Sequence, residues 1–220
     1  MGRSKAEVRA TYDRIAESYA AARVQPWPEV MDFITGLSAG GLVLDLGCGH
    51  GRHSRPLALT GHRVVGIDIS RRLLSIGKKA TSSSREFRPI AWLGADATVL
   101  PFPNEIFDAA LCIAVLHHLP SRKERTRALS EIRRVLRPGG EAFLSVWSLD
   151  DPHVADLLGK RPKKPDVEIP WRLPDGSAVL RPYHLFREGE LEELIIESGL
   201  HGERFFRGAG NWFALAKARG

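Results

Sequence analysis

The sequence predicts an α/β fold around a mostly parallel sheet, and three observations lead to that prediction. Apolar segments of strand length alternate with helical patterns from residue 42 to residue 147, which is the rhythm of βαβ units. A cluster of glycines follows the first of these strands and opens a helix, as ligand-binding turns of parallel sheets do. The chain has 220 residues, of which 43% are hydrophobic and 26% are charged, so residues 1–220 suit one globular domain.

Two helices precede the sheet in this prediction. Residues 4–24 carry apolar and aromatic side chains, including Tyr12 and Tyr19, at helical spacing. A second short helix follows the prolines of residues 26–28. We expect residues 1–40 to form a helical cap beside the ligand site.

The later elements follow from the same patterns. Predicted strands cover residues 42–46, 63–68, 90–95, 107–114, 141–147, 203–207 and 212–216, and predicted helices cover 52–59, 70–80, 122–136 and 187–198. Residues 149–182 hold six prolines and the basic run 160–164, with little periodicity. We predict that this segment is a long, partly mobile insert loop, and such loops are usually functional or disordered.

Charge, cysteine content and apolar runs limit the setting in which the chain works. The net charge of +6 and the isoelectric point of about 9.6 suit a polyanionic partner and, equally, a solvated basic surface. Cys48 and Cys112 are far apart and fit no metal spacing, so we expect reduced thiols and no bound metal. The amino terminus lacks the core of a signal peptide, and the longest apolar run, residues 109–116, is too short to cross a bilayer. We therefore expect a cytoplasmic protein without a membrane segment.

The glycine cluster indicates a cofactor class. Gly47, Gly49 and Gly51 form a G-x-G-x-G pattern, and Asp45 stands two residues before the first glycine. The pyrophosphate of a dinucleotide favours G-x-G-x-x-G instead. The pattern is typical of enzymes that use S-adenosylmethionine (SAM), and the backbone N–H groups that follow Asp45 are placed to hold its methionine part.

Further candidate cofactor residues occupy the carboxyl ends of the next two strands, where open α/β sheets bind their ligands. Asp68, followed by Ile69, is placed to accept both ribose hydroxyls, because Ser70 is the better N-cap for the helix that follows. Asp96 is placed to accept a hydrogen bond from the adenine amine, and Ala97 to donate its backbone N–H. A simple turn aspartate is the other interpretation of Asp96.

The fourth strand ends in Ile113, and a histidine pair, His117 and His118, follows it. These residues bring apolar atoms and two imidazoles to the expected position of the reactive methyl group. Adjacent residues of an extended segment point to opposite faces, and no carboxylate partner is in place, so we expect no zinc site. Each histidine is interpreted either as functional or as packed in the core.

Together, these strand ends resemble the class I SAM-dependent methyltransferases across residues 42–147. The resemblance implies a class I methyltransferase Rossmann-like fold, with a mostly parallel seven-stranded sheet, an antiparallel C-terminal strand, helices on both faces and SAM as cofactor. An NAD-dependent oxidoreductase would share the glycine loop and the acid after the second strand. It would not call for Asp45, for Asp96 with Ala97, or for the turn at residues 137–140.

Segments outside this core, and some within it, resemble the tRNA wobble-uridine carboxymethyl methyltransferases. The similarity lies in residues 23–28, 113–118, 124–125, 146–147, 169–171, 181–191 and 210–212. It implies esterification of the carboxylate of 5-carboxymethyluridine in tRNA. It also implies a small zinc-binding activator protein as partner, which covers apolar surface and adds a strand to the sheet edge. The chain departs from the family at His50, Arg52 and His53, where Asn-Gly-Lys-Tyr is usual across residues 50–53, at Ile69, where an arginine is usual, and in its shorter insert.

The resemblance further implies roles in a direct, in-line methyl transfer, which needs no general base because the acceptor is already an anion. Arg23 would hold the acceptor carboxylate with two hydrogen bonds and His117 would be a second donor, unless Arg23 only caps its helix. Trp27 and Trp212 would stack on the flipped base, or equally belong to the core. The other candidate substrate-binding residues are Arg125, Trp147, His184, Arg187 and Asn211.

Basic residues of the predicted helix 122–136 and of the run 160–164 are interpreted in part as a track for tRNA phosphates and in part as solvated surface. Two other functions remain open. A small-molecule O- or C-methyltransferase of the quinone-biosynthesis type shares the helix pattern of Tyr12, Tyr19 and Arg23. A catalytically silent SAM-binding protein would use the fold as a scaffold for RNA or protein.

Overall fold

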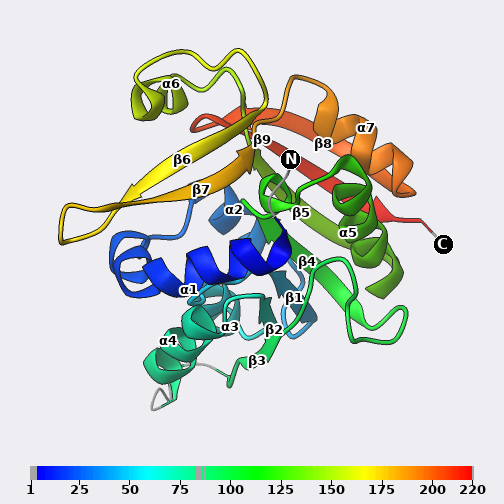
Figure 1. Cartoon of the computed structure of the whole chain (residues 1–220). Helices are drawn as coiled ribbons and strands as arrows, with labels where there is room; N and C mark the ends of the chain where they lie inside the picture. Colours follow the sequence, from blue (N-terminus) through cyan, green and yellow to red (C-terminus); the bar gives the residue numbers. More distant parts are fainter. Residues whose placement is uncertain (1–3, 83–85, 87, 220) are drawn as a thin grey trace.

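The computed structural model describes residues 4–82, 86 and 88–219, and its centre is a seven-stranded sheet in the order β3-β2-β1-β4-β5-β9-β8 (Figure 1). The strands are β1 Leu42–Leu46, β2 Arg63–Asp68, β3 Ala91–Gly94, β4 Phe107–Ile113, β5 Leu136–Trp147, β8 Leu200–Gly208 and β9 Asn211–Ala218. Strands β1 to β5 pair in parallel, whereas β9 pairs antiparallel with both β5 and β8. The predicted sheet, with its antiparallel C-terminal strand, is therefore confirmed.

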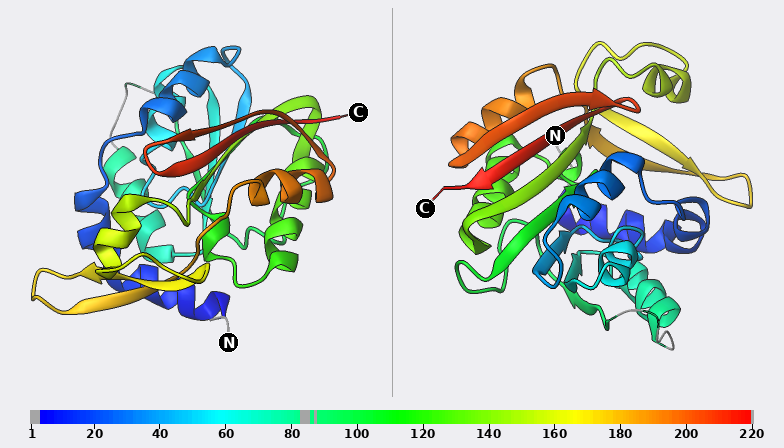
Figure 2. Two further views of the ribbon diagram at one scale, coloured as in Figure 1. Left: turned by 90° about the horizontal axis from the view of Figure 1, so that it is seen from above. Right: turned by 180° about the vertical axis from the view of Figure 1, so that it is seen from behind.

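Helices cover both faces of this sheet, which is why its parallel strands are nearly continuous apolar runs (Figure 2). The helices are α1 Lys5–Ala22, α2 Pro28–Gly36, α3 Ser54–Leu59, α4 Arg71–Thr81, the 3₁₀ turn η1 Leu116–His118, α5 Arg122–Val135, α6 Pro152–Leu158 and α7 Glu190–Glu197. Helices α5 and α7 pack on one face, around Leu44 and Leu144, and α2 and α3 pack on the other, around Val43 and Leu111. No helix in the described part of the chain has both the length and the apolar character needed to cross a membrane.

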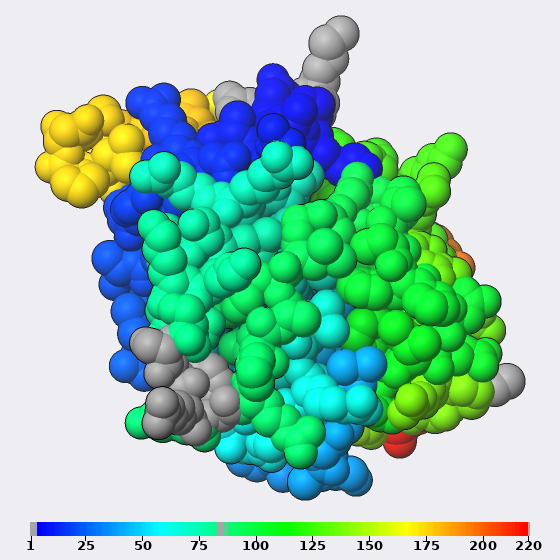
Figure 3. All heavy atoms as spheres, turned by 90° about the horizontal axis from the view of Figure 1, so that it is seen from below, coloured from blue at the N-terminus to red at the C-terminus, as the bar shows by residue number. Residues whose placement is uncertain are grey.

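Helix α1 lies beside α4 along the ligand side of the sheet (Figure 3). A capping box starts it, because the Ser4 hydroxyl accepts from the Glu7 N–H and the Glu7 carboxylate accepts from the Ser4 N–H. Its buried side places Tyr12 and Ile15 against Leu73 of α4. The two helices predicted before the sheet are thus α1 and α2, while residues 1–3 of the expected cap lie outside the described residues.

The insert differs from the sequence-based expectation. The sequence predicts an irregular loop over residues 149–182, but the structure forms α6 and then a hairpin of β6 Asp166–Arg172 and β7 Ala178–His184 (Figure 1). Residues 167, 169 and 171 alternate with polar neighbours as a strand requires, and the prolines within the hairpin obscure that period. Each strand of a two-stranded ribbon keeps a free edge, where a missing N–H donor is tolerated.

Candidate active site

A pocket opens at the carboxyl ends of the parallel strands, where the sequence predicts the cofactor. Seven of the eight predicted cofactor-binding residues line it: Gly47, Gly49, Asp68, Ile69, Asp96, Ala97 and Ile113. The eighth, Asp45, lies behind the loop; it is 2% exposed, and its carboxylate accepts a hydrogen bond from Ser54 Oγ at 2.5 Å. Helix α1 supplies the opposite wall with Lys5, Tyr12 and Tyr19.

The glycine loop takes a backbone shape that other residues resist. Gly47, Gly49 and Gly51 have φ angles of 71°, 57° and 84°, in the left-handed region. A Cβ at Gly47 would lie 2.2 Å from a methyl carbon of Val115. Asp68 holds the loop in place, because its carboxylate accepts from the Gly49 N–H at 2.8 Å. The loop thus presents its backbone to the pocket at close range.

Two buried carboxyl groups lie next to this loop. Burial raises the pKa of Asp45 from its ordinary 3.8 to about 6, and the hydrogen bond from Ser54 only partly opposes the rise. Burial likewise raises the pKa of Asp68 to about 6, against the backbone N–H groups of Ser70 and Gly49. A cationic ligand in the pocket favours the ionised form of both groups. The sulfonium and ammonium groups of SAM supply such a charge, so the residues present fit this cofactor.

Beside the pocket, side chains from three elements form a chain of hydrogen bonds. Nη1 of Arg181 donates to Oη of Tyr183 at 2.9 Å, and the hydroxyl oxygens of Tyr183 and Tyr12 lie 3.5 Å apart. Oη of Tyr12 lies 2.8 Å from Nε2 of His118, whose Nδ1 lies 3.3 Å from the carbonyl oxygen of Pro182. A carbonyl only accepts, so His118 carries its proton on Nδ1, and Nε2 accepts from Tyr12. The chain joins α1, η1 and β7.

The two histidines are neutral and line different spaces. Burial lowers the pKa of His118 to about 3 and that of His117 well below its ordinary range, and the charge of Arg181 adds to both effects. His118 lines both the cofactor pocket and a second cavity beside it, whereas His117 lines only the second cavity. Within the described residues, no group of three or more His, Cys, Asp and Glu side chains is arranged to hold a metal ion.

Three arginines, Arg23, Arg52 and Arg181, act on Tyr19 through their charges. None of them forms an ion pair with a carboxylate among the described residues. Arg52 lines the pocket, while Arg23 and Arg181 lie over the Trp171 ring, 5.8 and 5.0 Å from its centre. Stacking on a ring stabilises a cation without neutralising it. The arginine cluster therefore keeps its positive charge next to the cofactor pocket.

The structure does not bring Trp27 and Trp212 together. Trp27 packs on Phe213, with ring centres 5.9 Å apart, on the sheet face covered by α2. Trp212 neighbours Phe213 in β9, so it points to the opposite face, where Arg207 lies over its ring. The expectation that both rings stack on one base is corrected, because the sheet separates them.

Three other predicted substrate residues already bond within the protein. Arg125 is 5% exposed and donates to a backbone carbonyl, so it offers no free guanidinium to a phosphate. Both ring nitrogens of His184 lie 2.7 Å from carboxylate oxygens, of Asp166 and of Glu190. Asn211 is 5% exposed, and its amide donates to a backbone carbonyl. These contacts fix local structure, while Nε of Arg125 and Oδ1 of Asn211 are buried without a hydrogen-bond partner among the described residues.

Trp147 and Arg187 are placed differently. The Trp147 ring centre lies 4.9 Å from that of Tyr183 and 6.0 Å from that of His117, beside the second cavity. Arg187 is exposed just before α7. Of the predicted substrate residues outside the cofactor pocket, Trp147 and His117 thus come together.

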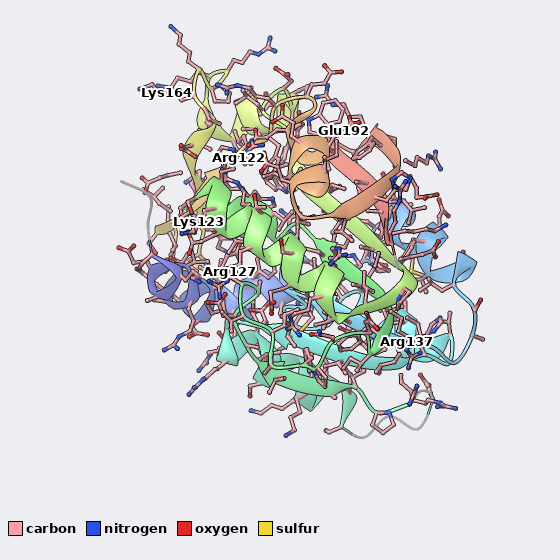
Figure 4. The ribbon with its side chains drawn as sticks, turned by 90° about the vertical axis from the view of Figure 1, so that its right-hand side faces the viewer. Arg122, Lys123, Arg127, Arg137, Lys164 and Glu192 are labelled. Atoms are coloured by element: carbon pink, nitrogen blue, oxygen red, sulfur yellow. The ribbon has the colours of Figure 1, made fainter. Side chains whose placement is uncertain are left out.

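The basic residues of α5 are mostly engaged within the protein. Arg122 pairs with Glu193 and Glu197 of α7, and Arg127 donates to the carbonyl of Thr98. Arg133 donates to the Gly199 carbonyl, and Arg134 pairs with Glu131. Figure 4 shows Arg122, Lys123 and Arg127 along α5, and Lys164 on the insert. The expected phosphate track on α5 is therefore reduced to Lys123, which has no ion-pair partner within the described ranges. The basic run 160–164 is more available for contacts with phosphates.

Sequence reasoning missed several residues of this site. Arg181 and Tyr183 escaped because the insert is interpreted as a loop, although Val179, Arg181 and Tyr183 occupy alternate positions and share the inward side of the hairpin. The available signal was a charged residue, Arg181, at one of the alternate positions that face inward. Lys5 had no local signal, since its bond to Asp96, at 2.7 Å, joins residues 91 positions apart.

Comparisons with known proteins agree with this geometry. Residues 44–144 match the family model described as a methyltransferase domain. The chain is 29% identical over 229 residues to a fission yeast (Schizosaccharomyces pombe) protein named tRNA (carboxymethyluridine(34)-5-O)-methyltransferase, covering 96% of this chain and 95% of that protein. An Arabidopsis thaliana protein of the same name is 37% identical over 179 residues, which are 81% of this chain but only 41% of the plant protein.

Solved structures support the fold. A methyltransferase of Haloferax volcanii, solved in complex with the Trm112 methyltransferase activator, superposes with a TM-score of 0.73 at 18% identity, over 97% of this chain and 98% of that one. At this identity, the likeness concerns the fold alone. The cofactor pocket and the family model together identify a SAM-dependent methyltransferase domain in this chain, and over most of its length the chain is similar to proteins named tRNA (carboxymethyluridine(34)-5-O)-methyltransferase.

Proposed function

We propose that the chain transfers the methyl group of SAM to the carboxylate of 5-carboxymethyluridine at the wobble position of tRNA. The observation that carries this proposal is the arginine cluster of Arg23, Arg52 and Arg181, which has no carboxylate partner among the described residues. SAM brings a single carboxylate, so the remaining cations favour an acceptor that is itself an anion. A guanidinium matches a carboxylate with two parallel hydrogen bonds.

The neutral histidines support a reaction that needs no base. When bound, SAM supplies a methyl group activated by its positive sulfur. A carboxylate oxygen is already ionised at neutral pH, so the protein only has to align it and exclude water. His118 has a pKa of about 3 and its Nε2 already accepts from Tyr12, so it is a weak base for a phenol or quinol. This disfavours the quinone-type alternative.

We assign the pocket residues as follows. The backbone of Gly47 and Gly49, supported by Asp45, holds the methionine part of SAM; Asp68 with Ile69 holds the ribose; Asp96 and Ala97 hold the adenine; and Ile113 lies beside the methyl group. Arg52, which lines the pocket next to the glycine loop, pairs with the methionine carboxylate. Arg23 and Arg181 then gather the acceptor carboxylate.

The tRNA contacts are assigned to groups that remain available. Arg187 and the lysines of the basic run, Lys160, Lys163 and Lys164, are exposed and suit phosphates, whereas Trp147 is half-buried beside the second cavity and suits the nucleoside. Trp27 and Trp212 lie on opposite faces of the sheet, so at most one of them meets the base.

We also propose a small zinc-binding activator as partner and the cytoplasm as the site of action. Strand β3 ends the sheet and has one unpaired edge. On it Leu93 is 38% exposed, and Val99 in the turn that follows is 57% exposed. An edge strand with apolar side chains is suited to accept a strand from a partner. The buried, unpaired thiols of Cys48 and Cys112 suit a reducing compartment.

The test is methyl transfer to tRNA that carries 5-carboxymethyluridine, measured by mass spectrometry of its nucleosides, with and without the activator. We expect Arg181→Met to lower kcat/KM by roughly 100-fold, since a buried charge contact is worth about 1.5–3 kcal/mol. Arg172→Met, on the exposed side of the same hairpin, is the matched control and should retain activity.

SAM affinity and unfolding curves of both variants show whether Arg181→Met still folds. The proposal is wrong if the wild-type protein with its activator leaves 5-carboxymethyluridine unchanged. Altered quinones in cells that lack the gene would then favour the small-molecule enzyme, and retained SAM binding without any product would favour the silent scaffold.

A further inference from the structure

A second cavity lies beside the cofactor pocket, between η1 and the β6–β7 hairpin. Its volume is about 370 Å³, within the range of roughly 300–1,000 Å³ that small-ligand sites occupy. His118 and Leu119 line both spaces, so they form a shared wall between the cavity and the cofactor pocket. The cavity and the cofactor pocket are therefore direct neighbours.

His117 holds an unused hydrogen-bond donor in the wall of this cavity. The side chain is 1% exposed and lines the cavity. Its Nδ1 accepts from the Trp147 N–H at 3.4 Å, so the neutral ring carries its proton on Nε2. Nε2 has no hydrogen-bond partner in the part of the chain that the structure describes. Buried donors are nearly always paired, and an orphan one is explained where a ligand completes it.

Aromatic rings and prolines form much of the wall. Tyr183 stacks on His117 at 15°, with ring centres 4.6 Å apart, and Pro120 and Pro182 add further apolar lining. Asp166 and Glu168 also line the cavity, and their negative charge disfavours a phosphate inside it. The chemistry is that of a neutral heterocycle whose carbonyl accepts a hydrogen bond.

We propose that this cavity takes the uracil ring of the acceptor nucleoside and that His117 donates from Nε2 to its O4. The inference rests on the proposed function. The carboxymethyl arm leaves the ring at C5 and must pass the shared wall to reach the methyl group. O4 sits on the carbon next to C5, so it is the ring carbonyl nearest that wall. His117 adjoins His118 of the wall, with ring centres 4.4 Å apart, and is the donor in reach.

The assignment makes His117 a specificity residue that reads the base. 5-Carboxymethylcytidine keeps the arm but carries an amino group in place of O4, so it presents a donor to a donor. Sites built to pair a particular polar group reject analogues that lack it by large factors. The wild-type enzyme should therefore methylate tRNA with 5-carboxymethyluridine far better than the same tRNA with 5-carboxymethylcytidine.

The test compares kcat/KM on these two tRNAs for the wild-type enzyme, with its activator, and for His117→Phe, His117→Gln and His153→Phe. We expect His117→Phe to raise KM for the uridine substrate by about 10- to 100-fold and to shrink the uridine-to-cytidine ratio by a similar factor. His117→Gln keeps a donor and should restore part of the ratio. His153→Phe changes an exposed histidine of α6 and should match the wild type.

SAM affinity should be unchanged in all variants, because His117 does not line the cofactor pocket. An active wild-type enzyme whose ratio survives His117→Phe overturns the base assignment and leaves the proposed function intact. An equal loss of SAM affinity also overturns it, because the residue would then act through the fold. A wild-type enzyme that methylates neither tRNA overturns the proposed function and this assignment with it.

Discussion

Asp45 and Asp68 illustrate how single residues of the site work against the stability of the empty protein. Their pKa values are raised by burial to about 6 in the folded state, from the ordinary 3.8. The native state therefore holds these protons more tightly than the unfolded chain does. Their contribution to stability is full below about pH 4 and is lost as the pH rises through about 6, by roughly 3 kcal/mol for one such carboxyl group. A bound cation reverses part of this loss.

Asp68→Asn tests that balance. We expect the variant to bind SAM about 10- to 100-fold more weakly, because a charged acceptor for the ribose is removed, while the empty protein at pH 7.5 unfolds at the same or a higher temperature. In the wild type, the Kd for SAM should rise as the pH falls through about 6, and in the variant this dependence should be weaker, because only Asp45 still titrates in that range. Calorimetric titration with SAM from pH 5 to 8 measures the Kd and its pH dependence, and thermal unfolding at pH 7.5 measures the stability of the empty protein.

The control for this prediction is Asp175→Asn, in an exposed turn of the insert where the carboxylate bonds only to Ser177. It should leave SAM affinity and its pH profile unchanged. Equal SAM affinity of Asp68→Asn and the wild type at pH 7.5 would contradict the assignment of the ribose to Asp68.

Elements that depend on short-range sequence patterns were predictable. The glycine loop, the strand ends and the hairpin of β8 and β9 follow from local sequence, because each depends on turn chemistry or on the period of apolar residues. Ser70 caps α4, as its position in the sequence predicts. The β6–β7 hairpin was not predictable from its prolines, and the packing of the Arg125 guanidinium over the Phe186 ring depends on a segment distant in the chain. Long-range polar contacts leave no periodic trace, so the acceptor side remained the least predictable part.

Helix α4 carries a glycine whose role runs against helix propensity. A Cβ at Gly77 would lie 2.7 Å from a ring carbon of Trp92 and 2.8 Å from the His50 carbonyl oxygen. Gly77→Ala should therefore destabilise the protein by about 1–3 kcal/mol, although alanine favours a helix by about 1 kcal/mol. Gly36→Ala, at the end of α2 with nothing within 4 Å of the added Cβ, should be neutral or slightly stabilising. Urea unfolding of both variants measures these changes in the free energy of unfolding. Equal stability of Gly77→Ala and the wild type would refute the close approach of α4 to the loop.

At the scale of the whole molecule, the net charge is +6, but the basic side chains differ in how free they are to bind tRNA. Much of the positive charge of α5 is already bonded to acidic side chains or to backbone carbonyls. The exposed lysines of the insert, Lys160, Lys163 and Lys164, remain outside that network. Electrostatic attraction of tRNA should therefore depend on the insert more than on α5.

Replacing Lys160, Lys163 and Lys164 together by glutamine should weaken tRNA binding and make it less dependent on salt. The slope of log K against log salt should become shallower by roughly 0.7–0.9 for each phosphate that the protein no longer neutralises. Lys78→Gln with Lys79→Gln, an exposed pair on α4, is the control and should keep the wild-type slope. Titrations of labelled tRNA at several salt concentrations give the slopes. A flat response in the wild type would argue against tRNA as the substrate.

The β6–β7 hairpin has a consequence for how such an enzyme can change. Within the described residues it forms a two-stranded ribbon apart from the seven-stranded sheet, and it carries Arg181 and Tyr183, which we propose to lie on the acceptor side of the site. The cofactor residues stand on the sheet and its loops. Under the proposed function, part of the acceptor recognition therefore lies on a stretch of chain that is separate from the glycine loop and the strand ends. Changes confined to residues 166–184 can alter contacts with the acceptor while leaving those cofactor residues in place.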